Sequence, residues 1–504
     1  MNAPASVAID PITVEVIGSA FASITEEMGE ALVKASYSTN IKERRDCSTA
    51  LFDADGRLVI QAEHIPVHLG ALPASVAAVR EHDVAPGEVW VLNDPFLGGS
   101  HLPDITLVSP IHVSGELLGW AASRAHHADV GGMVPASMPA DSTELHQEGL
   151  ILPPARLDDG LIALIAANSR AGDERRGDLR AQLAVHRLAE RRVADLCERR
   201  GADWWRTACA EVWDYAERRT RAAIAEMPDG RYEATETVEA ADEDLEIRAA
   251  IEIAGDRVSV DFEGTAPQHG GNLNCPLAVT VSACCFVLRV VADPDAPASG
   301  GAYAPITVSA PEGSLVNARS PAAVVAGNVE TSSRIADCLL RAFGEAIDAP
   351  AQGQGTMNNL TFGSPRFTYY ETIGGGQGAS RDGPGPSAVH VAMSNTLNTP
   401  VEALEAAYPL RVERYALRAG SGGAGRHRGG DGVVRALTAL EHCQASILSD
   451  RRRHAPRGAA GGGDGKPGSN RLNSRKLGAK ARVTLEPGDT ITIRTPGGGG
   501  YGNT

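Results

Sequence analysis

The sequence predicts an α+β protein with several domains, on the basis of three observations. The chain has 504 residues, which is too long for one compact core. Apolar residues recur at helical spacing near the N-terminus and again between 173 and 227. Beyond 230, short alternating runs and abundant glycine are typical of β-structure. We expect a mixed α/β metal-site domain, a helical hairpin, a mixed β/α domain and a glycine-rich β domain, over 1–170, 171–229, 230–365 and 366–504.

The composition narrows the class of function. A hydrophobic content of 43% and a charged content of 22% are those of a globular protein. The formal charge of −16 argues against nucleic acid as a partner, which would require a basic face. The eight cysteines include no C-x-x-C pair, so a cytoplasmic location is expected. No signal peptide and no run of 18 apolar residues is visible, so we expect no membrane partner.

The first element in chain order is a long amphipathic helix. Between Ile12 and Ser36, apolar residues recur every three or four positions, which is the spacing of one helical face. This stripe is most simply part of a core, and it consists of Val14, Ile17, Phe21, Ile24, Met28 and Leu32.

A shorter hairpin follows it. A strand to Phe52, a D-A-D-G turn and a second strand from Leu58 place Asp46 near Glu63 and His64. The stretch His64-Ile-Pro-Val-His68 adds polar groups at the same strand end. Two interpretations stay open: a salt-bridge group with Arg44 or Arg45, or a carboxylate that completes a metal site from this second hairpin.

The candidate functional site lies on the next hairpin. The runs Ile105–His112 and Leu117–Arg124 flank a Ser-Gly turn signal and predict two antiparallel strands. Their pairing brings two clusters to the open end of the hairpin, His101-Leu-Pro-Asp104 and His126-His127-Ala-Asp129. Imidazoles and carboxylates on a rigid hairpin are the ligands of a divalent metal.

The predicted register does not decide which of these side chains point into a common site. Pairing about the turn places Asp104 opposite Ala125 and His101 opposite Ala128. Alternation would then send Asp104 and His126 to opposite faces of an ideal strand. A buried histidine is usually only hydrogen-bonded, but packing four such groups together without a cation is expensive. The metal interpretation is therefore preferred.

The rest of the chain adds helices and loops. Glu148, before an extended Ile151-Leu-Pro-Pro stretch, would be either a general base or a solvated loop residue. The segment 173–227, broken at Gly201, predicts two antiparallel helices, and 279–291 and 331–343 predict two more.

None of the C-terminal glycine clusters fits a phosphate-binding loop, so we expect no nucleotide site.

Many motifs together identify a family. The chain resembles the hydantoinase B family over nearly its whole length and in order. This family also includes the C-terminal part of 5-oxoprolinases, a caprolactamase subunit and the metal-bearing subunits of acetone and acetophenone carboxylases. The resemblance is carried by ERRDCSTALFD, HIPVHLGAL, NDPFLGGSHLPDITLVSP, RAHHADVGG, QEGLILPP, GDLRAQ, VDFEGTAPQ, NTPVEALE, SGGAGRHRGG and TPGGGGYG.

The resemblance implies the metal-bearing subunit of an ATP-dependent, two-component amidohydrolase, in a hetero-tetramer or larger assembly. A hydantoinase A-like partner would bind ATP and phosphorylate a cyclic amide of hydantoin, lactam or 5-oxoproline type. This subunit would then open the ring, using one zinc, manganese or iron ion. Matched motif by motif, the expected metal ligands are Asp46, His101, Asp104 and His126. The expected catalytic groups, which move protons, are His127, Glu148 and Asp129.

Three alternatives make different predictions. A ketone carboxylase subunit of acetone or acetophenone type would require bicarbonate and typically a third, small subunit. An iron oxygenase would consume oxygen without ATP, because two histidines and a carboxylate also form a facial triad. In a non-catalytic scaffold, removal of His101 and His126 would change stability but not turnover.

Overall fold

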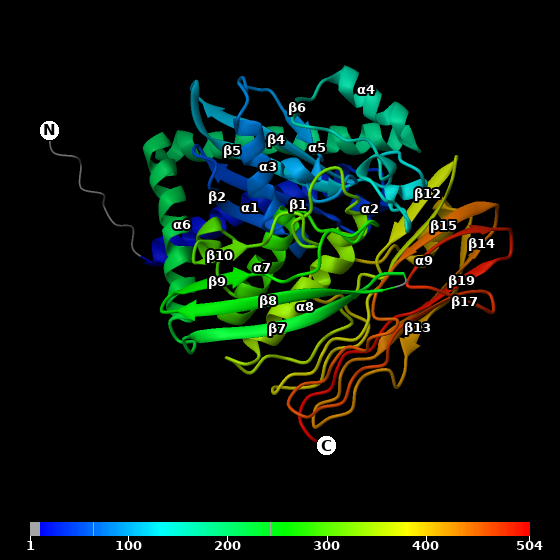
Figure 1. Ribbon diagram of the computed structural model, residues 1–504. Coiled ribbons are helices and arrows are strands. Elements are labelled where there is room, and N and C mark those ends of the chain that lie inside the picture. The colour runs from blue at the N-terminus through cyan, green and yellow to red at the C-terminus, as the bar shows by residue number, and fades with distance from the viewer. Residues whose placement is uncertain (1–10, 64, 242) are drawn as a thin grey trace.

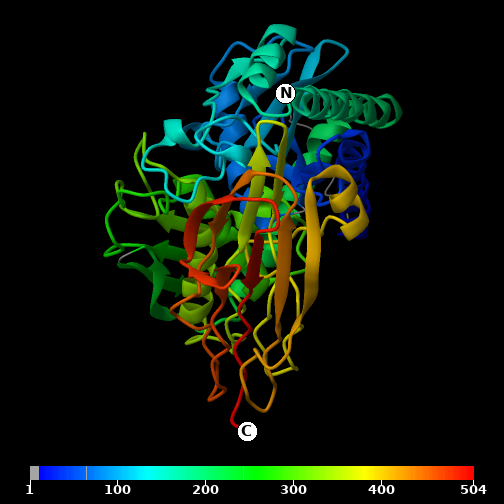
Figure 2. The same cartoon turned by 90° about the vertical axis from the view of Figure 1, so that its right-hand side faces the viewer.

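The computed structural model describes residues 11–63, 65–241 and 243–504. It contains four sheets of four to six strands, together with helices, so the predicted α+β, multidomain class is confirmed. In Figure 1 the N-terminal part lies at the top, the middle part at lower left and the C-terminal part at lower right. Figure 2 shows the C-terminal strands from the front.

The N-terminal sheet has the strand order β2-β1-β5-β4-β3-β6. Its strands are β1 Cys47–Asp53, β2 Leu58–Glu63, β3 Trp90–Leu92, β4 Asp104–Val113, β5 Glu116–His126 and β6 Ala155–Arg156. The helices of this part are α1 Pro11–Ala35, α2 Thr39–Lys42, α3 Ala71–Arg80, α4 Asp159–Asn168, α5 Gly172–Arg200 and α6 Ala202–Ile224. Short helical turns are η1 Pro66–His68, η2 Pro95–Leu97, η3 Pro135–Ser137 and η4 Leu145–Gln147.

Helices cover both faces of this sheet. The predicted apolar stripe of α1 is buried, and with α5 and α6 it packs on one face of the sheet. The opposite face packs against α3 through Leu72, Val76 and Val79. The two helices expected between 173 and 227 are α5 and α6, joined at Gly201.

A β-bulge sets the register of the central hairpin. His112 lies opposite Leu117 but Ile111 lies opposite Gly119, so Leu118 is an extra residue in β5. Its carbonyl accepts a hydrogen bond from the buried indole of Trp205 (3.0 Å). The predicted pairing of Asp104 with Ala125 is therefore wrong by one residue, because a bulge inserts one unpaired residue in a strand.

The middle part is a four-stranded sheet with the order β10-β9-β8-β7. Its strands are β7 Gly230–Glu239, β8 Asp244–Ala254, β9 Arg257–Asp261 and β10 Ile306–Ser309. Two helices in the predicted positions, α7 Leu277–Ala292 and α8 Ser332–Phe343, pack on it. The turn η5 spans Gly300–Tyr303, and a π-helical turn, η6 Gly327–Thr331, directly precedes α8.

The C-terminal part contains two sheets that share an apolar core. One sheet has the order β12-β11-β15-β18, and the other β13-β14-β19-β16-β17. The element bounds are β11 Asn359–Ser364, β12 Phe367–Glu371, α9 Val401–Ala407, β13 Leu410–Arg418, β14 Gly432–Ala439, β15 Cys443–Leu448, β16 Ser469–Leu472, β17 Arg475–Leu477, β18 Lys480–Leu485 and β19 Thr490–Arg494.

The glycine clusters form a bundle of segments that lie largely outside the β-strands. We define this glycine bundle as residues 374–379, 421–425, 428–432, 458–465 and 497–500. Its segments are joined by main-chain hydrogen bonds, such as Gly498 N to Gly430 O (2.9 Å) and Gly423 N to Gly498 O (2.8 Å). A Cβ atom at Gly498 would lie 2.0 Å from the carbonyl oxygen of Gln377, so only glycine allows this approach.

Across the three described stretches, no helix is both long and apolar enough to cross a membrane.

Candidate metal centre

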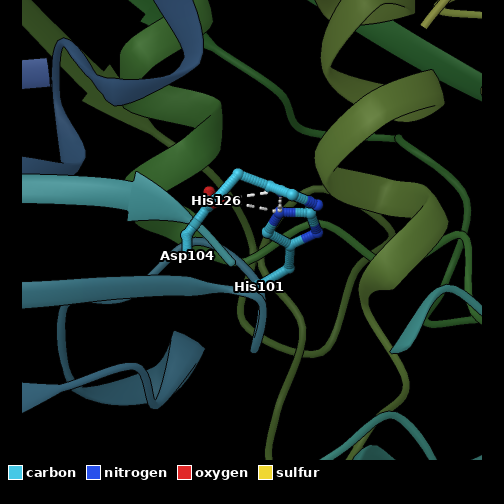
Figure 3. A group of neighbouring side chains, drawn as sticks. All are labelled: His101, Asp104 and His126. Atoms are coloured by element: carbon cyan, nitrogen blue, oxygen red, sulfur yellow. Dashed lines mark hydrogen bonds and ion pairs between the residues drawn. The ribbon is translucent and has the colours of Figure 1, made fainter. Parts of the chain in front are cut away.

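Three buried side chains converge at the open end of the central hairpin (Figure 3). His101 precedes β4, Asp104 begins β4 and His126 ends β5. Asp104 Oδ1 lies 3.0 Å from His101 Nε2 and 3.0 Å from His126 Nδ1, and these two nitrogens are 3.2 Å apart. We call these three residues the metal triad.

The spacing of the triad suits a bound cation. A tetrahedral metal with bonds of about 2.0 Å holds its ligand atoms about 3.3 Å apart. Each triad residue is at most 2% exposed. A positive charge between three buried ligand atoms would stabilise so close an arrangement. The triad residues therefore fit a divalent ion.

The bulge at Leu118 is the reason that the triad forms. Because it advances β5 by one residue, Asp104 lies directly opposite His126. Directly opposed residues project on the same face of a sheet. Without the bulge, Asp104 and His126 would point to opposite faces of the sheet. With it, both side chains can belong to one site.

Hydrogen bonds fix the Asp104 carboxylate. Its Oδ2 accepts a hydrogen bond from Ser100 Oγ (2.5 Å) and lies 3.4 Å from His68 Nε2. Burial alone would raise the pKa of Asp104, but the adjacent His101, with His126 and His68, holds that pKa well below its usual range. A carboxylate that stays ionised in a buried site is a suitable ligand for a cation.

Asp46 and His68 line the cavity beside the triad. The cavity has a volume of about 20 Å³ and is lined by the triad, Asp46 and His68, which is room for one water-sized group. Burial raises the pKa of Asp46 to about 7, with Asp104 adding to the effect and Arg44 opposing it. The main-chain oxygen of Asp46 accepts a hydrogen bond from His126 N (3.0 Å).

The register of the second hairpin is known from Ser48 onward. Ser48 lies opposite Glu63, two residues from Asp46, and the register shifts between Leu51 and Phe52. His64 lies outside the described residues. His68, from the same polar stretch, reaches the triad, with its Nδ1 2.9 Å from Ser48 Oγ. The sequence does not single out His68 as a neighbour of the triad, although the polar stretch 64–68 is a signal at this strand end.

The other walls come from distant parts of the chain. The ring of Tyr370, on β12, stacks on the imidazole of His126, with ring centroids 4.5 Å apart and planes at 16°. The buried guanidinium of Arg44 lies over the Tyr370 ring at 4.7 Å. Asn328 and Met357 also line the cavity. The site thus lies where all three parts of the molecule meet.

The three expected proton-transfer groups lie elsewhere. His127 Nε2 lies 2.9 Å from Gln182 Oε1, and burial lowers its pKa to about 4. Glu148 accepts hydrogen bonds from the hydroxyl of Ser142 and from main-chain N–H groups at 324 and 325, and burial raises its pKa to about 8. Asp129 accepts hydrogen bonds from the main chain at 131, 136 and 170. None of the three lines the triad cavity.

The chain is similar to proteins of one family over nearly its whole length. A model of the family described as Hydantoinase B/oxoprolinase matches residues 10–504. A 5-oxoprolinase 1 of Arabidopsis thaliana is 39% identical over 98% of this chain, which spans 42% of that relative. A putative D-/L-hydantoinase subunit from Pseudomonas sp. (strain NS671) is 30% identical, over 98% of this chain and 90% of its own length.

Two solved structures share the fold. The ATP-dependent caprolactamase from Pseudomonas jessenii superposes with a TM-score of 0.91 at 31% identity, covering 98% of this chain and 91% of that chain. A nucleotide-free acetone carboxylase structure has a TM-score of 0.87 at 17% identity, and the match covers 98% of this chain and 76% of that chain. At that lower identity the likeness concerns the fold alone.

Proposed function

Because the chain belongs to the hydantoinase B/oxoprolinase family, we propose that it is the metal-bearing subunit of an ATP-dependent, two-component enzyme that opens a cyclic amide. The observation that carries this proposal is the buried triad of His101, Asp104 and His126. The substrate would be a hydantoin, a lactam or a 5-oxoproline. The names of the 5-oxoprolinase, hydantoinase and caprolactamase relatives support this substrate class.

The nucleotide chemistry is assigned to a partner. The sequence holds no phosphate-binding loop, so a hydantoinase A-like subunit would bind ATP and phosphorylate the amide oxygen. A ring amide is a poor electrophile because its nitrogen donates electrons into the carbonyl. Phosphorylation of that oxygen would withdraw electrons from the ring carbon and favour the addition of water. The carbon–nitrogen bond would then break as the nitrogen takes up a proton, and hydrolysis of the resulting acyl phosphate would release the carboxylate and phosphate. The assembly would be a hetero-tetramer or larger.

We propose that Asp46 and the triad hold one zinc, manganese or iron ion. When bound, such an ion lowers the pKa of its water towards ~7 and supplies hydroxide. Asp104 supplies the negative charge at the centre of the triad, and Ser100 and His68 hold its second oxygen. Such supporting contacts orient ligands. The stack of Tyr370 on His126 shields that side of the site from water.

The proton-transfer roles expected for His127, Glu148 and Asp129 stay predictions. Each of these side chains makes its hydrogen bonds away from the cavity. A general base has to come within hydrogen-bond reach of the proton it removes.

The first test is elemental analysis of the purified protein. Wild type is compared with a His101→Ala/His126→Ala double variant, with folding checked by circular dichroism. A His82→Ala/His146→Ala variant, which removes two exposed histidines, is the matched control. We expect near-stoichiometric metal in wild type and control, and none in the folded triad variant. Equal metal content in all three proteins would refute the site.

The second test concerns the reaction. The chain is co-expressed with its partner, and the complex is supplied with ATP and ring amides. Ring opening that requires both ATP and the partner is expected. The alternative, the metal-bearing subunit of an ATP-dependent ketone carboxylase, instead predicts bicarbonate-dependent consumption of acetone or acetophenone by the same preparation.

A further inference from the structure

One face of the helix α5 is both polar and buried. Asp178, Gln182 and His186 follow one another at intervals of four residues, so they lie on the same side of the helix, and each is at most 3% exposed. We call these three residues the polar ridge. Buried polar groups are normally hydrogen-bonded, and Asp178 accepts bonds from the N–H groups of Tyr37 and Ser38, just before α2. The partners of the other two lie on the central hairpin.

Gln182 connects the two strands of that hairpin. Its Nε2 donates a hydrogen bond to the main-chain oxygen of Ile105 on β4 (3.1 Å), and its Oε1 lies 2.9 Å from Nε2 of His127, the residue after β5. A carbonyl oxygen can only accept, so the contact with Ile105 fixes the orientation of the carboxamide. Its oxygen then faces His127 and accepts a hydrogen bond from the imidazole Nε2–H.

Both contacts of Gln182 lie one residue from a member of the triad. Ile105 directly follows Asp104, and His127 directly follows His126. Successive side chains of a strand point to opposite faces, so the triad is on one side of the hairpin and α5 is on the other. Gln182 therefore holds the open end of the hairpin from behind the triad, without lining the triad cavity.

The open end of the hairpin benefits from such support. Asp104 is the first residue of β4 and His126 is the last of β5, and the ends of elements open more readily than their centres. Next to this pair, His127 N donates to the main-chain oxygen of Pro103 (2.8 Å). A metal site requires ligands held within about 0.5 Å of their working positions. A side chain bonded to both strand ends opposes their separation.

We propose that Gln182 is a positioning residue for the triad. Its bridge between the two strand ends holds Asp104 and His126 at the spacing that a metal ion requires. The inference rests on the proposed function, because it presupposes an ion at the triad. Gln182 itself touches neither the ion nor the substrate. Loss of the bridge should therefore change metal binding, in addition to any effect on stability.

The test uses the purified full-length chain and cobalt(II), an ion whose visible spectrum reports the number and geometry of its ligands. Gln182→Met has a similar length and removes both hydrogen bonds. Its cobalt affinity, from competition with a chelator, should fall by about tenfold or more, as for loss of a contact that supports a ligand. The spectrum of the bound ion should also differ from that of wild type. If this variant does not fold, Gln182→Asn retains a carboxamide that is too short to bridge both partners.

His186→Gln is the matched control, because it alters the same ridge one turn further along α5. The His186 ring contacts Ser109 on β4 and Ser123 on β5 (2.7 and 3.0 Å), so it also connects the two strands, but away from their open end. His186→Gln should retain the cobalt affinity and spectrum of wild type. Urea unfolding at neutral pH gives the stability of each variant, so that metal binding is compared between folded proteins.

Each outcome decides for or against the bridge. Wild-type cobalt affinity in a folded Gln182 variant would overturn the inference. Equal losses in Gln182→Met and His186→Gln would overturn it too, because the effect would then come from general packing of α5. A weaker affinity with an unchanged spectrum would do the same, since the ligand geometry would not depend on Gln182. A wild-type chain that binds no cobalt would refute the proposed metal centre itself, and with it the premise of this inference.

Discussion

The carboxylate of Asp104 and the imidazole of His126 lie directly opposite each other across β4 and β5, with Oδ1 and Nδ1 3.0 Å apart. His101 Nε2 approaches the same carboxylate oxygen at 3.0 Å. Asp104 is therefore the centre of the triad, while Asp46 contributes from the wall of the cavity. This difference in position leads to the first prediction.

Asp104→Asn should abolish stoichiometric metal binding, because it removes the negative charge that both triad histidines face. Asp46→Asn should weaken metal binding by a smaller factor. Equilibrium dialysis against a graded series of zinc concentrations measures both affinities. A larger loss in Asp46→Asn than in Asp104→Asn would show that the two carboxylates have been assigned in the wrong order.

His68→Gln should reduce metal affinity by about 10- to 100-fold, the usual effect of removing a group that orients a ligand. The reason is its position 3.4 Å from Asp104 Oδ2. Competition with a chromogenic chelator gives the affinity. His82→Gln, at an exposed site, is the control. Wild-type affinity in His68→Gln would mean that Ser100 alone orients the carboxylate.

Glu148→Gln should change kcat by less than about threefold and leave its pH profile unaltered, because loss of a true general base costs about 10²- to 10⁴-fold. The Glu148 carboxylate is held by Ser142 and by the N–H groups of Val324 and Val325. If Glu148 has a structural role, the Glu148→Gln variant should have a lower melting temperature than wild type. A collapse of kcat together with a shifted pH optimum would instead confirm the catalytic role expected for Glu148 from the sequence.

His186 should make the folded chain sensitive to acid. Its buried ring contacts Ser109 and Ser123 (2.7 and 3.0 Å), and burial lowers its pKa from 6.5 to about 3. The folded state thus keeps His186 neutral while the unfolded state takes up a proton below pH 6.5. This contribution to stability is complete above 6.5 and is lost as the pH falls towards 3, with a limiting slope of about 1.4 kcal/mol per pH unit.

His186→Gln removes this titration, so its stability should depend less steeply on pH below 6.5 than that of wild type. Urea unfolding at pH 7, 5.5 and 4.5 (conditions chosen around the 6.5 value) measures the two slopes. Parallel slopes for the two proteins would show that His186 is protonated equally in the folded and unfolded states.

Gly498→Ala should destabilise the glycine bundle by about 1–3 kcal/mol or more, which is the cost of overpacking. The added Cβ would lie 2.0 Å from Gln377 O. Gly383→Ala is the control, because nothing lies within 4 Å of its Cβ position and its φ is not positive. The control should stay within about 0.5 kcal/mol of wild type. Equal stabilities of the two variants, from thermal unfolding, would contradict the packing of the bundle.

The hairpin and its three metal-binding candidates could be predicted from sequence because they depend on local features. The Ser114-Gly115 turn and the apolar runs on either side of it bring His101, Asp104 and His126 to one end. The bulge at Leu118 could not be predicted, because it depends on Trp205, a residue of α6 that donates to the Leu118 carbonyl. One extra residue decides whether His126 faces Asp104 or turns away from it.

The remaining walls depend on contacts between distant segments. Tyr370 stacks on His126, and Asn328 reaches the cavity from a π-helical turn, but no periodicity in the sequence links these residues to the hairpin. His127, Glu148 and Asp129 are candidates only because they lie beside the ligands in sequence or in a matching motif. Adjacent strand residues point to opposite faces, so nearness in sequence did not bring His127 into the cavity beside His126.

The position of Tyr370 has a consequence for the order of events during synthesis. All three triad residues precede β12 in the chain, and the sheet that carries Tyr370 also contains β18 (Lys480–Leu485). Until the strands of that sheet have been synthesised and have folded, His126 lacks its aromatic cover. The growing polypeptide therefore exposes the triad to solvent at a stage when the rest of the N-terminal sheet is already available to fold.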